Sequence, residues 1–148
     1  MVIFMNKINI RNAIKEDCAA ICDICNNDLG YPCEQTLVEE KIKHLSSNRE
    51  AVFVAVMNSI VIGYIHVEKY DTLYFETMAN ILGLAVKNEY RNKGVGKKLL
   101  LTAEAWSVEN QIKIMRLNSG VSRTNAHNFY RHLGYNSEKE QLRFMKRL

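Results

Sequence analysis

Residues 80–100 read NILGLAVKNEYRNKGVGKKLL, and this stretch decides the fold because it joins a buried strand to an amphipathic helix. Asn80–Val86 is a short apolar run, typical of a strand covered on both faces. Lys87–Tyr90 is polar and turns the chain. From Gly94 to Val108 apolar residues recur at helical spacing and predict one buried helix face: Val95, Leu99, Leu100, Ala103 and Trp106.

The turn between strand and helix is suited to binding an anion. Gly94 and Gly96 let the backbone approach a ligand closely. A helix N-terminus presents free N–H groups and a partial positive charge. Arg91 and Lys93 would add charge-assisted hydrogen bonds. We therefore expect a phosphate group here, although a cluster of basic residues is as often a solvated helix face.

Two familiar phosphate motifs do not fit this turn. A dinucleotide-binding loop needs a third glycine where Leu99 stands, and a Walker loop needs a hydroxyl where Lys98 follows Gly96-Lys97. The turn belongs to neither class.

Length and composition favour one domain, residues 1–148, with 47% apolar residues. The net charge of +4 is too mild to predict a nucleic-acid partner and is compatible with a small polyanion. No apolar run approaches the roughly 20 residues that cross a bilayer, so we expect no membrane partner. Residues 1–7 precede no small-residue cleavage site, which favours a cytoplasmic location.

The cysteines Cys18, Cys22, Cys25 and Cys33 lie near the N-terminus. Cys22-x-x-Cys25 is compatible with zinc, but no second ligand pair follows at zinc spacing. Helical spacing instead predicts one apolar face, on which free cysteine packs as a small hydrophobe: Ile14, Cys18, Ile21, Cys22, Cys25 and Leu29. We expect core packing and no metal.

Periodicity predicts the remaining elements around this stretch. The expected strands are Lys7–Arg11, Ala51–Met57, Ile60–Lys69, Ile112–Leu117 and Gln141–Lys146; the expected helices are 15–28, 34–45 and 124–132. The order β-α-α-β-β-β-α-β-α-β predicts a mixed α/β fold.

Two motifs resemble those of the GNAT superfamily of acetyl-CoA-dependent N-acetyltransferases. Arg91–Gly96 resembles its Arg/Gln-x-x-Gly-x-Gly/Ala signature, and Ala126–Tyr135 resembles its A-x-x-F-Y-x-x-x-G-F/Y signature. They occur in the family's order and spacing, and with the preceding elements the resemblance covers nearly the whole chain.

The resemblance implies a mostly antiparallel twisted sheet, splayed between the fourth and fifth strands and flanked by helices. Acetyl-CoA would be the co-substrate, its pantetheine arm lying along Leu84, Ala85 and Val86. The pyrophosphate would be held in the loop by Arg91, Asn92, Lys93, Gly94, Val95, Gly96 and Lys97.

Tyr130 matches the family's general acid, and an aromatic anchor for the last helix is the structural alternative. Arg123 stands where many members carry an asparagine that contacts the cofactor. Either Asn125 replaces that contact, or Arg123 binds phosphate, or Arg123 is simply solvated.

The general base is less clearly marked. Some members carry a glutamate where this chain has Asn80, which cannot accept a proton but can position a water. His66 has a suitable pKa class, and Glu68 and Glu76 are the other candidates. A lone histidine on a strand is more often structural.

The acceptor pocket is predicted around the turn after the first helix and around residues 70–78, with Tyr31 and Glu76 as substrate-binding candidates. The resemblance implies acetyl transfer to a primary amine of a small molecule, by direct attack in a ternary complex. A protein N-terminal or lysine acetyltransferase and a non-catalytic acyl-CoA-binding module are the alternatives. Both a monomer and a homodimer remain open.

Overall fold

The computed structural model describes residues 7–137 and 139–148, and the chain divides into two compact units, Met1–Leu117 and Asn118–Leu148. Residues 1–6, where the sequence predicts no cleavage signal, lie outside the described part.

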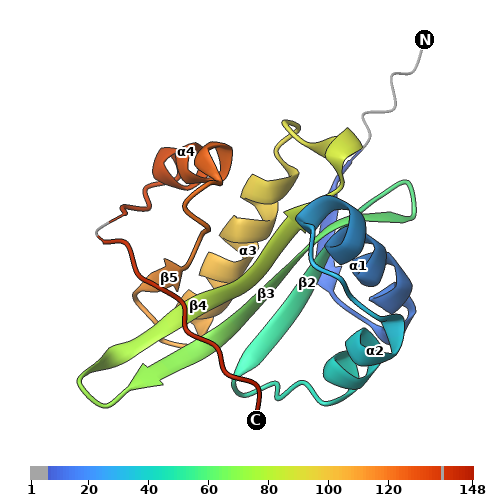
Figure 1. The fold of residues 1–148 in the computed structure, drawn as a ribbon. Coiled ribbons are helices and arrows are strands. Elements are labelled where there is room, and N and C mark those ends of the chain that lie inside the picture. Colours follow the sequence, from blue (N-terminus) through green and yellow to red (C-terminus); the bar gives the residue numbers. More distant parts are fainter. Residues whose placement is uncertain (1–6, 138) are drawn as a thin grey trace. The chain divides into compact units, whose positions relative to one another are not determined.

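The first unit is built on a five-stranded sheet with the strands in chain order (Figure 1). The strands are β1 (Asn9–Asn12), β2 (Glu50–Met57), β3 (Ile60–Thr72), β4 (Phe75–Val86) and β5 (Met115–Leu117). The first four pair antiparallel with their neighbours, whereas β4 and β5 are parallel. The mixed, mostly antiparallel sheet predicted from the sequence is therefore confirmed.

A two-residue turn sets the register of β2 and β3. Asn58 and Ser59 both have positive φ, 50° and 63°. Left-handed conformations at both central positions give a turn whose twist matches the twist of the flanking strands. The Asn-Ser turn expected from the sequence is thus confirmed.

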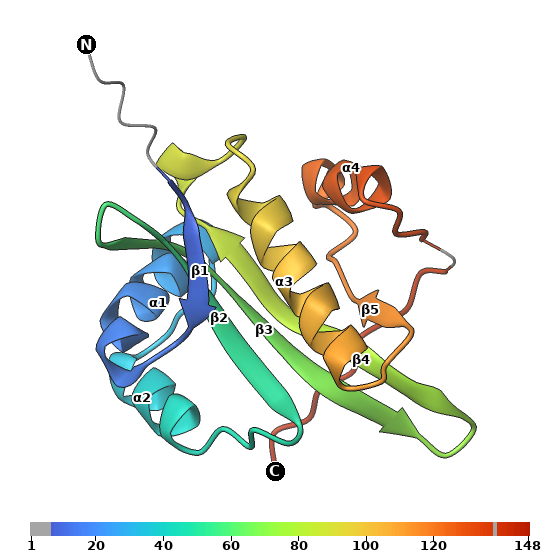
Figure 2. The same ribbon diagram turned by 180° about the vertical axis from the view of Figure 1, so that it is seen from behind.

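Helices cover both faces of this sheet. One face carries α1 (Cys18–Ile24) and α2 (Gln35–Lys43), and the opposite face carries α3 (Val95–Glu109) (Figures 1 and 2). A 3-10 turn, Lys15–Asp17, precedes α1, and a π-helical turn, Cys25–Leu29, follows it. The second unit contains α4 (Thr124–His132).

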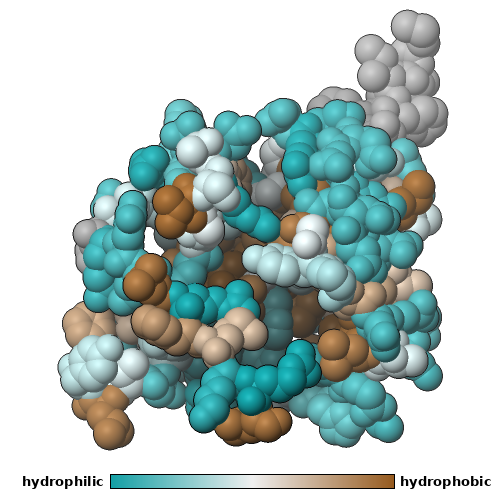
Figure 3. All heavy atoms as spheres, in the orientation of Figure 1, coloured by the Kyte–Doolittle hydropathy of each residue, from teal (hydrophilic) through white to brown (hydrophobic). Residues whose placement is uncertain are grey.

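The core forms where these helices meet the sheet. On the side of α1 and α2 it consists of Ile21, Ile24, Val52, Val54, Val61, Tyr64 and Ala85. Under α3, Val95, Leu99, Leu100 and Ala103 are almost fully buried. Burying each of the larger side chains contributes roughly 1.5–3 kcal/mol. Polar residues cover most of the face in Figure 3, with apolar ones scattered among them.

Three expectations were wrong. β4 begins at Phe75 rather than Asn80, because its first residues also pair with the end of β3, across a register shift between Tyr70 and Thr72. Residues 141–146 form no strand, and alternation alone does not make one without a pairing partner. Ile14 is 48% exposed because it precedes the helix at the corner, while Ile24, which we did not assign to the buried face, is fully buried.

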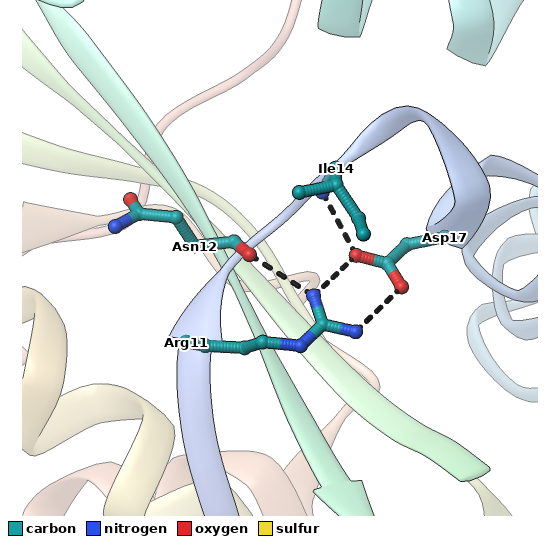
Figure 4. Close-up of polar contacts among 4 residues, drawn as sticks. All are labelled: Arg11, Asn12, Ile14 and Asp17. Carbon is teal, nitrogen blue, oxygen red and sulfur yellow. Dashed lines mark hydrogen bonds and ion pairs between the residues drawn. The ribbon is translucent and has the colours of Figure 1, made fainter. Parts of the chain in front are cut away.

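The corner between β1 and α1 is held by a buried carboxylate, Asp17 (Figure 4). Its oxygens accept hydrogen bonds from both terminal nitrogens of Arg11, at 2.7 and 2.9 Å, and from the N–H of Ile14 at 2.8 Å. Burial alone would raise the pKa of Asp17. The hydrogen bonds and the charge of Arg11 outweigh it and hold that pKa below 3.8.

Replacing Asp17 by asparagine should destabilise the fold by about 2 kcal/mol at neutral pH, because charged hydrogen bonds are lost at a buried position. The native contribution is complete above the unfolded-state pKa and is lost as pH falls through the lower folded-state pKa. The difference in stability between the native protein and Asp17→Asn should therefore shrink in acid, once the pH falls below 3.8.

Urea unfolding of both proteins, at neutral pH and in acid, measures this difference in stability. The exposed Asp23, changed to asparagine, is the matched control and should leave stability nearly unchanged. A deficit in Asp17→Asn that persists undiminished in acid would contradict the assignment.

Candidate functional site

The open side of β4 is the main feature of the site. β4 pairs with β3 from Phe75 to Val86, but with β5 only at residues 79–81. Within residues 7–117, therefore, the segment 82–86 has a strand on one side only. The splay between the fourth and fifth strands is confirmed.

The backbone groups of this segment alternate in direction. The N–H of Lys87 donates to the carbonyl of Ile62 at 2.8 Å, which marks a hydrogen-bonded position of the antiparallel ladder. Alternation along the ladder then turns the N–H and C=O groups of Leu84 and Val86 away from β3. These are the two residues predicted to offer backbone contacts. Ala85, between them, points its side chain into the core.

A β-bulge lies at the beginning of the open segment. The register between β3 and β4 shifts at His66/Val67, so that Leu82 has no partner in β3. Gly83 follows, and a Cβ placed on it would lie 3.0 Å from the hydroxyl oxygen of Tyr64. The glycine thus makes room for the tyrosine across the strands. Bulges commonly re-aim residues beside functional sites.

The loop after β4 presents a helix N-terminus. Asn92 and Gly94 adopt left-handed conformations, with φ of 62° and 82°, and α3 begins at Val95. No side chain of the described residues caps this end. The first helical hydrogen bond of the loop runs from the N–H of Lys98 to the carbonyl of Gly94 at 3.1 Å. The N–H groups of residues 95–97 are thereby left for an anion.

The basic side chains of the loop make other contacts. Arg91 donates to the carbonyl of Asp28 at 2.9 Å and to the carbonyl of Val86 at 3.3 Å. The Asp28 carboxylate accepts the N–H of Asn88 at 2.9 Å. Arg91, predicted as an anion ligand, thus clamps the loop to the π-helical turn. Lys93 lies 5.6 Å from the centroid of the Tyr90 ring.

A row of polar residues crosses four strands at the closed end of β4. Glu50, Glu68, Asn80 and Arg116 are successive cross-strand partners from β2 to β5. Asn80 is only 8% exposed. Its amide nitrogen donates to Glu68 at 3.0 Å, and its amide oxygen accepts from Arg116 at 2.7 Å.

The row brings together two predicted residues and adds two that sequence reasoning missed. His66 contacts the Glu50 carboxylate at 2.8 Å, on the same face as Asn80. Arg116 carries its guanidinium 4.5 Å from the centroid of the Tyr70 ring. The sequence held one signal for Arg116, because it is a cationic residue between Met115 and Leu117 in a short apolar strand. It held no signal for Glu50.

The acceptor candidates lie apart from this row. Tyr31 follows the π-helical turn and is 53% exposed. Glu76 is exposed near the β3–β4 turn, four residues before Asn80 along the strand, or about 13 Å. Glu76 therefore does not join Asn80 and His66.

In the second unit, Tyr130 is half-buried on α4. Its ring makes edge contacts with Phe129 and Tyr135, at centroid distances of 5.2 and 6.0 Å. Burial raises the pKa of Tyr130, and the charge of Arg123 partly opposes this rise. The phenol is therefore protonated at neutral pH. Arg123 precedes α4, and Asn125 lies in its first turn, both exposed.

The cysteines pack as the helical pattern indicates. Cys18 and Cys22 are buried, and all four thiols are free. Cys22 donates to the carbonyl of Cys33 at 3.3 Å, and the sulfur of Cys25 lies 3.3 Å from the hydroxyl of Tyr64. Burial and the neighbouring thiols raise the pKa of Cys33 to about 12.

No cluster of three or more histidine, cysteine or acidic side chains is arranged to hold a metal ion within the described ranges. No helix in that part of the chain is long and apolar enough to cross a membrane.

Comparison with known proteins identifies relatives in sequence and in structure. Residues 18–135 match the model of the acetyltransferase (GNAT) family. An uncharacterised N-acetyltransferase of Chlorobaculum tepidum is 33% identical over 135 residues, covering 88% of this chain and 77% of the relative.

Two solved structures share the fold. Aminoglycoside N-acetyltransferase AAC(6')-Iy in complex with CoA has a TM-score of 0.85 at 18% identity, over 100% of both chains. A transcriptional regulator from Bacillus halodurans C-125 has a TM-score of 0.82 at 22% identity, over 95% of this chain and 100% of that one. At these identities the likeness shows the fold alone.

The purified, untagged chain should contain no stoichiometric zinc, because its thiols hydrogen-bond to protein groups. At neutral pH Cys33 should react slowly with thiol reagents, since its raised pKa leaves little thiolate. Elemental analysis and thiol titration measure both. One zinc per chain, lost when Cys22 and Cys25 are replaced, would contradict the structural interpretation.

Proposed function

The chain belongs to the acetyltransferase (GNAT) family, and on this premise we propose that it transfers the acetyl group of acetyl-CoA to a primary amine of a small molecule. Residues 1–148 would act as one catalytic domain. The observation that carries the proposal is the open edge of β4, which leads directly into the uncapped N-terminus of α3.

The coenzyme fits this feature in two parts. The N–H groups of residues 95–97, together with those of the preceding loop from Asn92, would hold the pyrophosphate. The pantetheine amides would pair with the outward backbone groups of Val86 and Leu84, replacing the missing strand. Four residues of strand span about 13 Å, which would bring the thioester end near Leu82.

The acceptor class is supported by the fold and by charge. The aminoglycoside N-acetyltransferase in complex with CoA shares the whole fold. Glu50 and Glu68 lie on the face of the sheet that α1 and α2 cover. They are next to residues 79–81, where β4 is still paired with β5. Carboxylates there would attract a cationic amine. Two further residues remain proposed acceptor contacts: Tyr31, after the π-helical turn, and Glu76, at the beginning of β4.

The proposed chemistry is direct attack within a ternary complex. The amine nitrogen bonds to the acetyl carbon, the carbon–sulfur bond breaks, and the coenzyme leaves as a thiolate. The amine must lose its proton, and the thiolate must gain one. Tyr130 is the proposed donor to the thiolate, because its motif position matches and its raised pKa keeps the phenol protonated. Arg123 would ease loss of that proton.

We propose that polar side chains on β3 and β4 remove the proton of the amine. His66 is one acceptor, oriented by Glu50 at 2.8 Å. Asn80 cannot take a proton, and its proposed role is to position a group that does. Arg123 and Asn125 remain proposed contacts to the cofactor, and a cytoplasmic monomer or homodimer is the proposed setting.

A screen of primary amines with acetyl-CoA, reading thiol release, tests the function. We expect turnover with at least one small amine and none with peptides. Gly96→Val would place a branched side chain in the path of the pyrophosphate, so coenzyme affinity should fall at least tenfold, or about 1.4 kcal/mol.

Calorimetry measures that affinity, with unfolding curves to confirm that the variant folds. Unchanged affinity in folded Gly96→Val would refute the loop as the coenzyme site. Turnover with peptides alone would shift the acceptor to a protein.

Tyr130→Phe keeps the ring and removes only the proton donor. The turnover rate should fall about 10²-fold, a typical general-acid contribution, while coenzyme affinity and stability stay near native. Steady-state kinetics, calorimetry and thermal unfolding separate these effects. A loss of stability in proportion to the loss of rate would instead identify the tyrosine as a structural anchor.

A further inference from the structure

We propose that Glu68 is the residue that accepts the proton of the acceptor amine, and that Asn80 and Arg116 hold its carboxylate in position. The inference rests on the proposed function and names the base of that same site. Glu68 would be a catalytic residue, whereas Asn80 and Arg116 would be positioning residues.

The first support is a chain of hydrogen bonds with one direction. Arg116 donates to the amide oxygen of Asn80 at 2.7 Å, and the amide nitrogen of Asn80 donates to Glu68 at 3.0 Å. A guanidinium only donates and an ionised carboxylate only accepts. The two neighbours therefore fix which end of the Asn80 amide faces Glu68, and Asn80 cannot rotate without losing both bonds.

The second support is the free oxygen of Glu68. Asn80 contacts one carboxylate oxygen, Oε1. Within the part of the chain that the structure describes, the other oxygen accepts no hydrogen bond, and the residue is half-buried rather than enclosed. An oriented carboxylate with one open oxygen is suited to accept a proton, directly or through one water.

The third support is an arrangement that stability does not favour. Glu68 lies directly opposite Glu50 across β2 and β3, and like charges in that position are destabilising. A ring nitrogen of His66 lies 2.8 Å from the Glu50 carboxylate. Among the described residues, the hydrogen-bond donor to Glu68 is the neutral amide of Asn80. Departures from local rules of this kind concentrate at functional sites.

The fourth support is position. Asn80 is the cross-strand partner of Glu68, and it lies two residues before the bulge at Leu82, where β4 loses its second partner. The thioester end of the coenzyme is proposed at that point.

The proton balance is simple. As the amine nitrogen bonds to the acetyl carbon, its proton passes to the open oxygen of Glu68. The thiolate released by cleavage of the carbon–sulfur bond takes the phenolic proton of Tyr130. Glu68 later gives its proton to solvent and the Tyr130 phenolate regains one from solvent, so that the net products are the amide and the free thiol.

The decisive experiment compares two replacements of Glu68 with the best amine from the screen. Glu68→Gln keeps an acceptor for Asn80 but cannot take a proton, so kcat should fall about 10²-fold with coenzyme affinity unchanged. Glu68→Ala should lose a similar factor, and added formate should restore part of the rate in proportion to its concentration. A merely structural role would not respond to formate.

Matched variants test the positioning residues and the specificity of the effect. Asn80→Ala and Arg116→Met should lower kcat by a smaller factor, without formate rescue and with native coenzyme affinity. The exposed Glu109, at the C-terminal end of α3, changed to glutamine should keep the native kcat. His66→Gln is measured beside Glu68→Gln, because His66 is the other candidate acceptor of the amine proton.

The outcomes separate the two proposals. Native turnover together with full kcat in Glu68→Gln would overturn the assignment of Glu68 and leave the proposed function standing. A native chain that acetylates no amine would overturn both. A larger loss in His66→Gln than in Glu68→Gln would assign the proton to the histidine instead.

Discussion

The unpaired side of β4 is the constraint on which the rest of the site depends. Backbone N–H and C=O groups must find partners, and between residues 82 and 86 the first unit supplies a strand on one side only. The parallel contact with β5 ends after Ile81. A site that needs main-chain partners therefore lies within the sheet, and it ends at the N–H groups of α3.

The loop and the segment after α1 are fastened together by Arg91 and Asp28. The guanidinium holds the carbonyls of Val86 and Asp28, and the Asp28 carboxylate holds the N–H of Asn88. The π-helical turn that carries Asp28 is of a kind often found at functional sites. The proposed acceptor wall around Tyr31 is thus joined by hydrogen bonds to the proposed coenzyme loop.

The polar row across β2–β5 differs from the rest of the sheet because it places a buried amide and two like charges where apolar side chains would be more stable. Asn80 is buried, yet both ends of its amide are paired, so its burial is tolerated. Glu50 and Glu68 face each other as like charges; among the described residues His66 contacts Glu50, and Asn80 donates to Glu68. The core under α1 and α3 is mostly apolar, and Ser107 is a buried polar exception on α3.

Periodicity and motifs in the sequence determined the helices, most of the strands, the glycine loop and the family, because these depend on local spacing and on residues adjacent in the chain. The early start of β4 and the missing strand at 141–146 depend on pairing between distant segments, which local pattern does not contain. The Arg91 contacts exist only because the loop after β4 packs against the π-helical turn. The row of Glu50, Glu68, Asn80 and Arg116 exists only through sheet register. Register places residues from four strands side by side, and that decision belongs to the tertiary structure alone.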